Sequence, residues 1–407
     1  MKVLIVVDEL SVSGGTQKTT LKTSLGLQKL GNDVTVLTSY VDPERCYPEL
    51  NAKVKLYSLF KSKSPALIKN FVVSNGLFSV LFKTLAFALF INTKFINYDS
   101  IIIEDVVGIL ALFFSFKRKR KIVWYLNNQF SSLTIGVFKG NIGVFRFNFP
   151  EWLKVFIMRF MKVVYFTCFS KLDYFLTYDI QNMEKIREIG FDNVKVILPG
   201  TDITSENYFP RKNFRKINIL SIGTFAFYRR YEDIIEALKI IDRNNDKLIN
   251  RLIIVGVWDS NPKYYQFLKG ILEGTDLRRK VVFISYLDRV QLDRLYKKTN
   301  VFVFVNDENT WGLAVAEAIM HGLPVIITNN IGISEILSER ECYKVEPRNP
   351  QQIARAILNI YQNPSKAYAK EIAAYRKIKS LSWDRFVKRV NSILVLASSR
   401  KNIIKSE

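Results

Sequence analysis

Acidic residues are scarce over a long stretch of the first half of the sequence. Between Glu49 and Asp173 the chain has only four Asp or Glu residues but 18 Lys and Arg residues. The formal net charge of the whole chain is +23 at pH 7. An excess of this size predicts an anionic partner, which can be nucleic acid, a phosphate-bearing ligand or an anionic membrane surface.

Histidine and cysteine are scarce as well. The chain has a single histidine, His321, and three scattered cysteines, Cys46, Cys168 and Cys342. This pattern excludes a disulfide framework and a Cys/His zinc site, and it favours a reducing compartment. Pairs of Asp residues at metal-ligand spacing are also missing, so the sequence predicts no metal site.

Long apolar runs are absent, since none reaches the ~20 residues that a membrane-spanning helix needs. The N-terminal run, residues 3–7, is too short for a signal peptide and has the length of a buried strand. Segments 77–91 and 149–169 are longer, rich in aromatic residues, and carry Lys and Arg. Such helices suit a membrane interface, although core helices can show the same pattern. An anionic membrane surface is therefore an expected partner.

Strand-like and helix-like patterns alternate along the chain. The first series opens with a strand at 2–7 and a helix at 17–30, and a second series begins with a strand at 217–222. Alternation of this kind predicts parallel sheets with right-handed crossovers. We therefore expect an α/β protein with two Rossmann-like domains, residues 1–200 and 201–380, that face a central cleft.

The densest group of polar residues lies in segment 306–318, between an expected strand and an expected helix. Gly312 allows the backbone to approach a ligand closely, and a helix start offers free N–H groups to a diphosphate. Glu317 lies early in the expected helix. Its carboxylate can accept hydrogen bonds from a ribose diol, or it can merely complement the helix dipole.

A second polar loop, residues 223–233, also joins an expected strand to an expected helix. It contains Gly223 and the adjacent pair Arg229 and Arg230. The planar guanidinium group suits phosphate oxygens, so this pair predicts a site that stabilises a departing diphosphate. A solvated surface pair is the alternative interpretation.

Together these segments resemble the family 4 glycosyltransferases, retaining enzymes of the two-domain GT-B fold. The resemblance runs over most of the chain, and its most specific part is the block from Glu317 to Ile326. The Gly14-Gly15 loop, the Pro199-Gly200 junction and residues 223–237 also match. In that family the last helix, here within 381–407, crosses back to the N-terminal domain. The opening residues are similar to those of lipid-linked-oligosaccharide mannosyltransferases of the family.

The resemblance implies a nucleotide-sugar donor, which is a substrate, and it implies no cofactor. Arg229 would replace the family's phosphate-binding lysine, and Glu317 would hold the ribose. Two departures concern the sugar and the phosphate: Asn309 stands where a second glutamate is usual, and Thr224 stands where an arginine is usual. The remaining residues expected at the donor are Gly14, Gly15, Gly223, Arg230, Glu308, Gly312 and Leu313.

The histidine that is common in the N-terminal domain of the family is missing. Its neighbourhood contains Glu104 and Asp105 at the end of an expected strand. These carboxylates could orient or deprotonate an acceptor hydroxyl, or simply pair with nearby cations. Glu104 is therefore expected among the catalytic residues, together with Arg229 and Glu317.

The sequence thus predicts a retaining glycosyltransferase that moves a sugar from a UDP- or GDP-sugar to a membrane-associated, polyprenyl-linked glycan. We expect it to be cytoplasmic and peripheral on the inner face of the membrane. The alternatives are a soluble enzyme of the same fold, such as a sugar or polysaccharide synthase or a nucleotide-sugar epimerase, and a non-catalytic homologue. A nucleic-acid partner is not expected, because no recognised module is found and the basic residues lie beside apolar runs.

Overall fold

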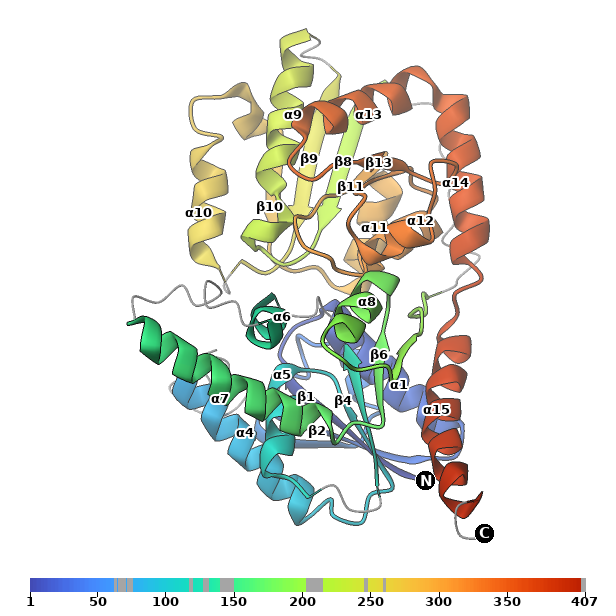
Figure 1. Cartoon of the computed structure of the whole chain (residues 1–407). Helices are drawn as coiled ribbons and strands as arrows, with labels where there is room; N and C mark the ends of the chain where they lie inside the picture. The colour runs from blue at the N-terminus through green and yellow to red at the C-terminus, as the bar shows by residue number, and fades with distance from the viewer. Residues whose placement is uncertain are drawn as a thin grey trace. The chain divides into compact units, whose positions relative to one another are not determined.

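The computed structural model describes residues 1–61, 64, 71, 76–116, 120–126, 132–139, 150–202, 215–244, 248–258 and 261–403. The chain divides into two compact units. The first comprises residues 1–200 and 383–407, and the second comprises residues 201–382. Each unit has one parallel β-sheet with helices packed on it (Figure 1), which confirms the predicted fold class of two α/β units.

The sheet of the first unit has the strand order β3-β2-β1-β4-β5-β6-β7. Its central strands are continuous apolar runs because helices cover both of their faces, and residues 3–7 of β1 are almost wholly buried. The sheet grows from β1 in one direction and from β4 in the other, so the topological switch point lies between these two strands. The strands are β1 (Lys2–Leu10), β2 (Asp33–Val41), β3 (Leu56–Lys61), β4 (Ser100–Ile103), β5 (Lys121–Leu126), β6 (Tyr174–Thr177) and β7 (Val194–Val196).

The helices of the first unit include the two apolar segments noted in the sequence. These form α4 (Leu77–Asn92) and α7 (Glu151–Phe169), whereas residue 149 lies outside the described residues. Both helices pack against α5 and the short helix η1. The other elements are α1 (Gly15–Lys29), α2 (Pro48–Asn51), α5 (Val106–Ala111), η1 (Leu112–Phe114), α6 (Ser132–Lys139) and α8 (Ile180–Glu188).

The last helix, α15 (Trp383–Ile403), belongs to the first unit and packs on α1 and β5. Gly26 of α1 lies so close to it that an added Cβ would be 2.5 Å from Val387 Cγ2. At the end of α1, Asn32 Nδ2 donates a hydrogen bond to Asn391 Oδ1 over 3.1 Å. The C-terminal segment thus contributes buried apolar side chains to the first unit.

The sheet of the second unit has the strand order β10-β9-β8-β11-β12-β13. Here the switch point lies between β8 and β11. The strands are β8 (Ile217–Ile222), β9 (Ile249–Val255), β10 (Val281–Ile284), β11 (Val301–Phe304), β12 (Val325–Thr328) and β13 (Tyr343–Val345). The helices are η4 (Phe227–Arg229), α9 (Tyr231–Asn244), α10 (Pro262–Gly270), η5 (Asp276–Arg279), α11 (Arg289–Lys298), α12 (Leu313–Met320), η6 (Gly332–Glu335), α13 (Pro350–Gln362) and α14 (Pro364–Ile378).

Candidate functional site

Arg229 lies at the switch point of the second unit. Its loop follows β8, and its Nη1 donates to the side-chain oxygen of Asn306, just after β11, over 3.3 Å. The guanidinium carbon lies 4.7 Å from the ring centroid of Phe304. Arg229 therefore links the carboxyl ends of the two strands between which ligands of such sheets bind.

Gly223 provides the space that this arginine occupies. A Cβ added at position 223 would lie 3.0 Å from both Cζ and Nε of Arg229. The Nε atom is buried, and within the described residues it has no hydrogen-bond partner. A buried guanidinium N–H without an acceptor is costly, so this donor suits an anionic ligand oxygen.

Arg230 has a different environment, although it is the next residue. Its backbone is left-handed, with φ of 49°, and its side chain forms ion pairs of 2.8 Å with both Glu232 and Asp233. Burial lowers the pKa of Arg230, but its hydrogen bonds to Asp233 and the charges of Glu232 and Asp307 raise that pKa above its ordinary value. Three carboxylates, among them Asp307 at 3.8 Å, thus surround the Arg230 guanidinium, and its binding of phosphate stays a prediction.

The segment predicted to hold the diphosphate leads into α12, and the residue before this helix has a left-handed backbone that favours glycine. Gly312 has φ of +92° and is the N-cap of the helix, which begins at Leu313. Glu317 follows one turn later and accepts a hydrogen bond from the Tyr296 hydroxyl over 3.4 Å. The carboxylate of Glu317 and the free N–H groups of the helix start therefore belong to the same short helix.

The two candidates for the sugar contact differ in exposure. Glu308 is exposed, whereas Asn309 is 3% exposed. His321 contacts both α11 and α12. Its Nδ1 lies 2.8 Å from the Glu317 carbonyl oxygen, its Nε2 lies 3.2 Å from Asp293 Oδ1, and its ring stacks on Tyr296.

In the first unit, Gly14 and Gly15 form the start of α1. Gly14 is the N-cap and has an extended backbone with φ of −118°, so its conformation does not itself require glycine. An added Cβ would lie 2.5 Å from Gln17 Oε1, which is the end of a flexible side chain. The approach of this loop to a diphosphate remains a prediction.

Glu104, predicted to be catalytic, is 3% exposed and accepts a hydrogen bond of 2.6 Å from Thr20 of α1. The neighbouring Asp105 is half-buried and caps α5, because its Oδ1 accepts from Gly108 N over 2.8 Å. Its other oxygen accepts from the backbone N–H of Asp8, two residues before the end of β1. Hydrogen bonds thus hold both carboxylates in place, and the catalytic role of Glu104 stays a prediction.

Asp8 and Lys83 are polar partners that sequence reasoning missed. Lys83 Nζ lies 2.8 Å from Asp8 Oδ2, and its side chain is 1% exposed. Ser39 Oγ donates to Asp8 Oδ1 over 3.0 Å. Burial, and then the charge of Asp8, raise the pKa of Asp105 to about 7. The only available signal was the position of Asp8 directly after the apolar core of the first strand.

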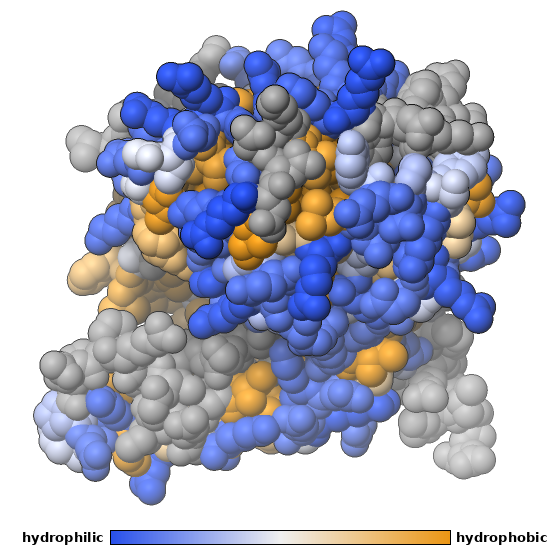
Figure 2. Space-filling model, turned by 90° about the horizontal axis from the view of Figure 1, so that it is seen from above, coloured by the Kyte–Doolittle hydropathy of each residue, from blue (hydrophilic) through white to orange (hydrophobic). Residues whose placement is uncertain are grey.

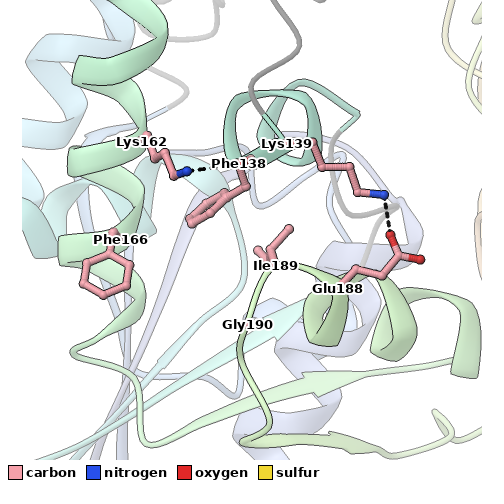
Figure 3. A pocket seen from close by; sticks show the side chains of 7 residues that line it. All are labelled: Phe138, Lys139, Lys162, Phe166, Glu188, Ile189 and Gly190. Atoms are coloured by element: carbon pink, nitrogen blue, oxygen red, sulfur yellow. Dashed lines mark hydrogen bonds and ion pairs between the residues drawn. The ribbon is translucent and has the colours of Figure 1, made fainter.

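A separate pocket of about 330 Å³ lies among α6, α7 and α8 (Figure 3). Two lysines flank it: Lys139 pairs with Glu188 at 2.7 Å, and Lys162 Nζ donates to the Phe138 carbonyl. The end of α8 leads into β7, so this pocket lies toward the amino-terminal edge of the sheet. Ligands of parallel α/β sheets bind at the opposite edge, and we do not assign the pocket to the reaction.

The chain has two parallel α/β units, and the second contains Arg229, the helix α12 that begins after Gly312, and Glu317. This combination is typical of two-domain glycosyltransferases. Comparison with known proteins agrees with this class. The family model described as glycosyl transferases group 1 matches residues 204–378, which lie within the second unit. The chain is a glycosyltransferase, and its resemblance to family 4 is confirmed.

Similar proteins were found over part of the chain and over nearly the whole of it. An uncharacterized glycosyltransferase of Methanocaldococcus jannaschii is 28% identical over 182 residues, which are 44% of this chain and 45% of that protein. Human alpha-1,3/1,6-mannosyltransferase ALG2 is 22% identical over 409 residues, covering 93% of this chain and 91% of that protein. The structure of Anabaena HepE in complex with UDP and glucose has a TM-score of 0.72 at 14% identity, covering 97% of this chain and 99% of that chain.

Proposed function

We propose that this glycosyltransferase moves a sugar from a UDP- or GDP-sugar, with retention of configuration, to a polyprenyl-linked glycan at the cytoplasmic face of a membrane. The observation that carries the lipid-linked acceptor is an exposed apolar face on α4 and α7. The similarity to mannosyltransferase ALG2 over most of the chain supports a glycan acceptor and a mannosyl donor. HepE, with UDP and glucose bound, supports a nucleotide-sugar donor.

The apolar face consists of large side chains that recur at helical spacing and have no cover within the described residues. On α4 a leucine is exposed every fourth residue, and on α7 aromatic residues follow the same rule. Phe78 is 80% exposed and Trp152 is 70% exposed. We call the following set the apolar face: Leu77, Phe78, Leu81, Phe82, Leu85 and Leu89 of α4, and Trp152, Phe156, Phe160, Val163 and Phe166 of α7.

Basic residues border this face. Arg159 and Lys162 are exposed on α7 next to Phe160 and Val163. Aromatic side chains beside Lys and Arg suit a helix that lies in the plane of an anionic lipid interface. No helix in the described part of the chain is long and apolar enough to cross a membrane. On the side of the molecule shown in Figure 2, apolar residues instead form separate patches among hydrophilic ones, as is normal for protein surfaces.

The donor would be held in the second unit. Arg229 would stabilise the leaving diphosphate through its unpartnered Nε, and the start of α12 at Gly312 and Leu313 would bind phosphate oxygens. Glu317 would accept from the ribose hydroxyls, and Asn309 would contact the sugar hydroxyls. In this proposal the reaction needs no cofactor or metal, because the charge of the leaving group meets an arginine and a helix start.

The first experiment identifies the donor and the acceptor. The purified chain is incubated with radiolabelled UDP- and GDP-sugars, and either a polyprenyl-diphosphate-linked glycan in detergent or soluble sugars and sugar phosphates. We expect label in the lipid fraction and none in soluble products. Label in soluble sugars alone would favour the soluble synthase, and epimerised donor without transfer would favour the epimerase.

The second experiment tests the apolar face by co-sedimentation with vesicles. Wild type should bind vesicles that contain phosphatidylglycerol more strongly than vesicles of phosphatidylcholine alone, and salt should weaken this binding. Phe78→Glu and Phe160→Glu should each reduce binding about 10-fold or more, since each removes buried apolar area. Val290→Glu on α11 is the matched control, because Val290 is exposed outside the apolar face. Equal binding by all variants would refute the membrane-docking role.

A further inference from the structure

Asp307 joins the loops of four strands at the carboxyl edge of the second sheet. It follows β11, and its backbone N–H donates to the Tyr228 carbonyl, in the loop after β8, over 2.8 Å. Its own carbonyl accepts from Asn330 Nδ2, after β12, over 2.9 Å. Its carboxylate accepts from Arg348, after β13, through Nη2 over 2.7 Å and through Nε over 3.0 Å. Each hydrogen-bonding group of Asp307 is thus bonded to the loop of another strand.

Two arginines with a left-handed backbone meet at this carboxylate. Three non-glycine residues in the described part of the chain have a positive φ, and two of them are Arg230, with φ of 49°, and Arg348, with φ of 58°. Arg230 Nε lies 3.8 Å from Asp307 Oδ2, the oxygen that Arg348 Nη2 also contacts. A left-handed backbone is unfavourable for a residue with a Cβ, and such residues cluster where proteins hold their ligands.

The stability of the fold does not account for the contact between Asp307 and Arg348. The Arg348 side chain is 68% exposed, and an ion pair at such a position contributes little to the free energy of unfolding. Glycine would adopt the same backbone without strain. An arginine adds a planar guanidinium, which holds the carboxylate through both Nε and Nη2. The feature that requires an arginine here is therefore the orientation of Asp307.

The segment around Asp307 carries groups that are proposed to bind the donor. Asn306, the residue before it, accepts a hydrogen bond from Arg229 Nη1 over 3.3 Å. Asn309 follows two residues later and is 3% exposed, and Gly312 is the N-cap of α12. A shift of Asp307 would therefore displace the arginine contact on one side of it, and the proposed sugar and phosphate contacts on the other.

We infer that Asp307, held by Arg348, is a positioning residue that fixes segment 306–312 in its donor-binding conformation before the donor arrives. The inference rests on the proposed function, because it concerns the donor site assigned there. A loop that is already ordered loses less conformational entropy on binding, so the same contacts give a higher affinity. The contact between Asp307 and Arg348 therefore acts on donor affinity more than on stability.

The first test compares stability with nucleotide affinity in Arg348→Gly. Calorimetric titration with UDP and with GDP measures the dissociation constant, and thermal unfolding measures Tm. Because glycine relieves the strained backbone, Tm should equal that of wild type or exceed it, whereas the dissociation constant should rise about 5-fold or more. General damage to the fold would lower Tm as well. Unchanged affinity would overturn the inference.

Two further arginine variants separate orientation from charge. Arg348→Lys keeps the positive charge but loses the planar fork, so it should show most of the loss of affinity. Arg355→Ala, which removes an exposed arginine from α13, is the matched control and should change neither Tm nor affinity. If Arg348→Lys binds nucleotide as tightly as wild type, charge alone suffices and the orienting role is refuted.

Deuterium exchange of the backbone amides in segment 306–312 tests the same contact without any nucleotide. Asp307→Ala and Arg348→Gly should each accelerate exchange in this segment about 10-fold or more. The double variant should exchange no faster than the faster single variant, since its second change removes a contact that is already lost. Exchange in α10, which lies outside these loops, is the internal reference. Rates in segment 306–312 equal to those of wild type would contradict the inference.

The outcomes distinguish this inference from the donor assignment. If Arg229→Ala and Glu317→Ala weaken nucleotide binding but Arg348→Gly does not, the donor site stands and only the positioning role fails. If neither UDP nor GDP binds to wild type, the donor assignment itself fails, and the positioning role fails with it. Weaker binding in all three variants, with Tm preserved in Arg348→Gly, supports both.

Discussion

The two switch points of this glycosyltransferase have the same topology but opposite side-chain charges. In the second unit, Arg229 links the ends of β8 and β11, and its Nε has no partner among the described residues. In the first unit, Asp8 and Asp105 lie near the ends of β1 and β4, and one buried lysine compensates part of their charge. The topology of each sheet thus predicts where a ligand binds, and the charge of the side chains at that place predicts the charge of the ligand.

This difference matches the two halves of a sugar transfer. A nucleotide diphosphate gains negative charge as it leaves, so cationic and N–H donors stabilise it. An acceptor hydroxyl donates a hydrogen bond, so a carboxylate can orient it. The following predictions test whether each unit has the role that its charge indicates.

The largest effect is expected for Arg229→Ala. Loss of a donor directed at the developing negative charge lowers kcat by about 10²- to 10³-fold, and Arg229→Lys should recover part of it because the charge is retained. The measurement is the transfer rate at saturating donor. Arg355→Ala, at an exposed position of α13 in the same unit, should leave that rate unchanged. A mild effect of Arg229→Ala would remove the main support for the donor site.

Glu317→Ala should act mainly on donor binding. A hydrogen bond to a charged group contributes about 1.5–3 kcal/mol, so the KM for the donor should rise roughly 10- to 100-fold while kcat changes less. Glu273→Ala, at an exposed position of the same unit, is the control for loss of a negative charge. If Glu317→Ala leaves the KM for the donor unchanged, the carboxylate only complements the dipole of α12. The assignment of Glu317 to the ribose then fails.

The sequence alone was sufficient to predict both sheets, because alternating apolar strands and amphipathic helices leave few topologies. It was also sufficient to predict the helix that begins after Gly312, because the glycine and the apolar helix are adjacent in the chain, whereas the role of Glu317 stays a prediction. The sequence could not distinguish the environments of Arg229 and Arg230, because these differ through the backbone. The left-handed conformation of Arg230 directs its side chain toward three carboxylates.

The network of Asp8, Lys83 and Asp105 could not be predicted for a related reason. The expected first strand ended at Val7, because charged residues indicate a strand end, whereas β1 continues to Leu10. Lys83 looked like a polar interruption of an apolar helix, and only tertiary packing brings it to a residue 75 positions away. The exposure of the apolar face likewise depends on which side of α4 meets the sheet, and a helix that is apolar on most sides does not reveal this.

A matched pair of glycine substitutions, one at each switch point, should have smaller effects than the substitutions above. Gly223→Ala would place its Cβ 3.0 Å from Arg229 Cζ, so the arginine must shift and kcat should fall about 5- to 50-fold with little loss of stability. Gly108→Ala would place its Cβ 2.8 Å from Ile103 Cγ2 and 3.2 Å from Val6 Cγ1. Since these are core side chains, we expect a loss of about 1–3 kcal/mol in the free energy of unfolding. Denaturant titration and kinetics of both variants distinguish the two outcomes. A loss of stability in Gly223→Ala and a loss of kcat in Gly108→Ala would contradict the comparison.

The smallest effect concerns the pH dependence of stability, to which Asp105 should contribute. Its pKa is about 7 in the folded chain against 3.8 for the ordinary carboxyl. Between these values the folded state holds a proton that the unfolded state has released, so the contribution of Asp105 to stability falls as pH rises from about 4 to 7.

The measurement is the difference in Tm between wild type and Asp105→Asn across this pH range. As pH rises, the Tm of wild type should fall relative to the Tm of the variant, by a few degrees in total for a compact unit of this length. The difference should level off above pH 7. Asp179→Asn provides the reference for loss of a cap carboxylate in the same unit. A difference in Tm that stays constant with pH would mean that the Asp105 carboxylate is ionised throughout. Asp105 would then exchange no proton in this pH range. The two switch points would differ only in the sign of the charge on their side chains.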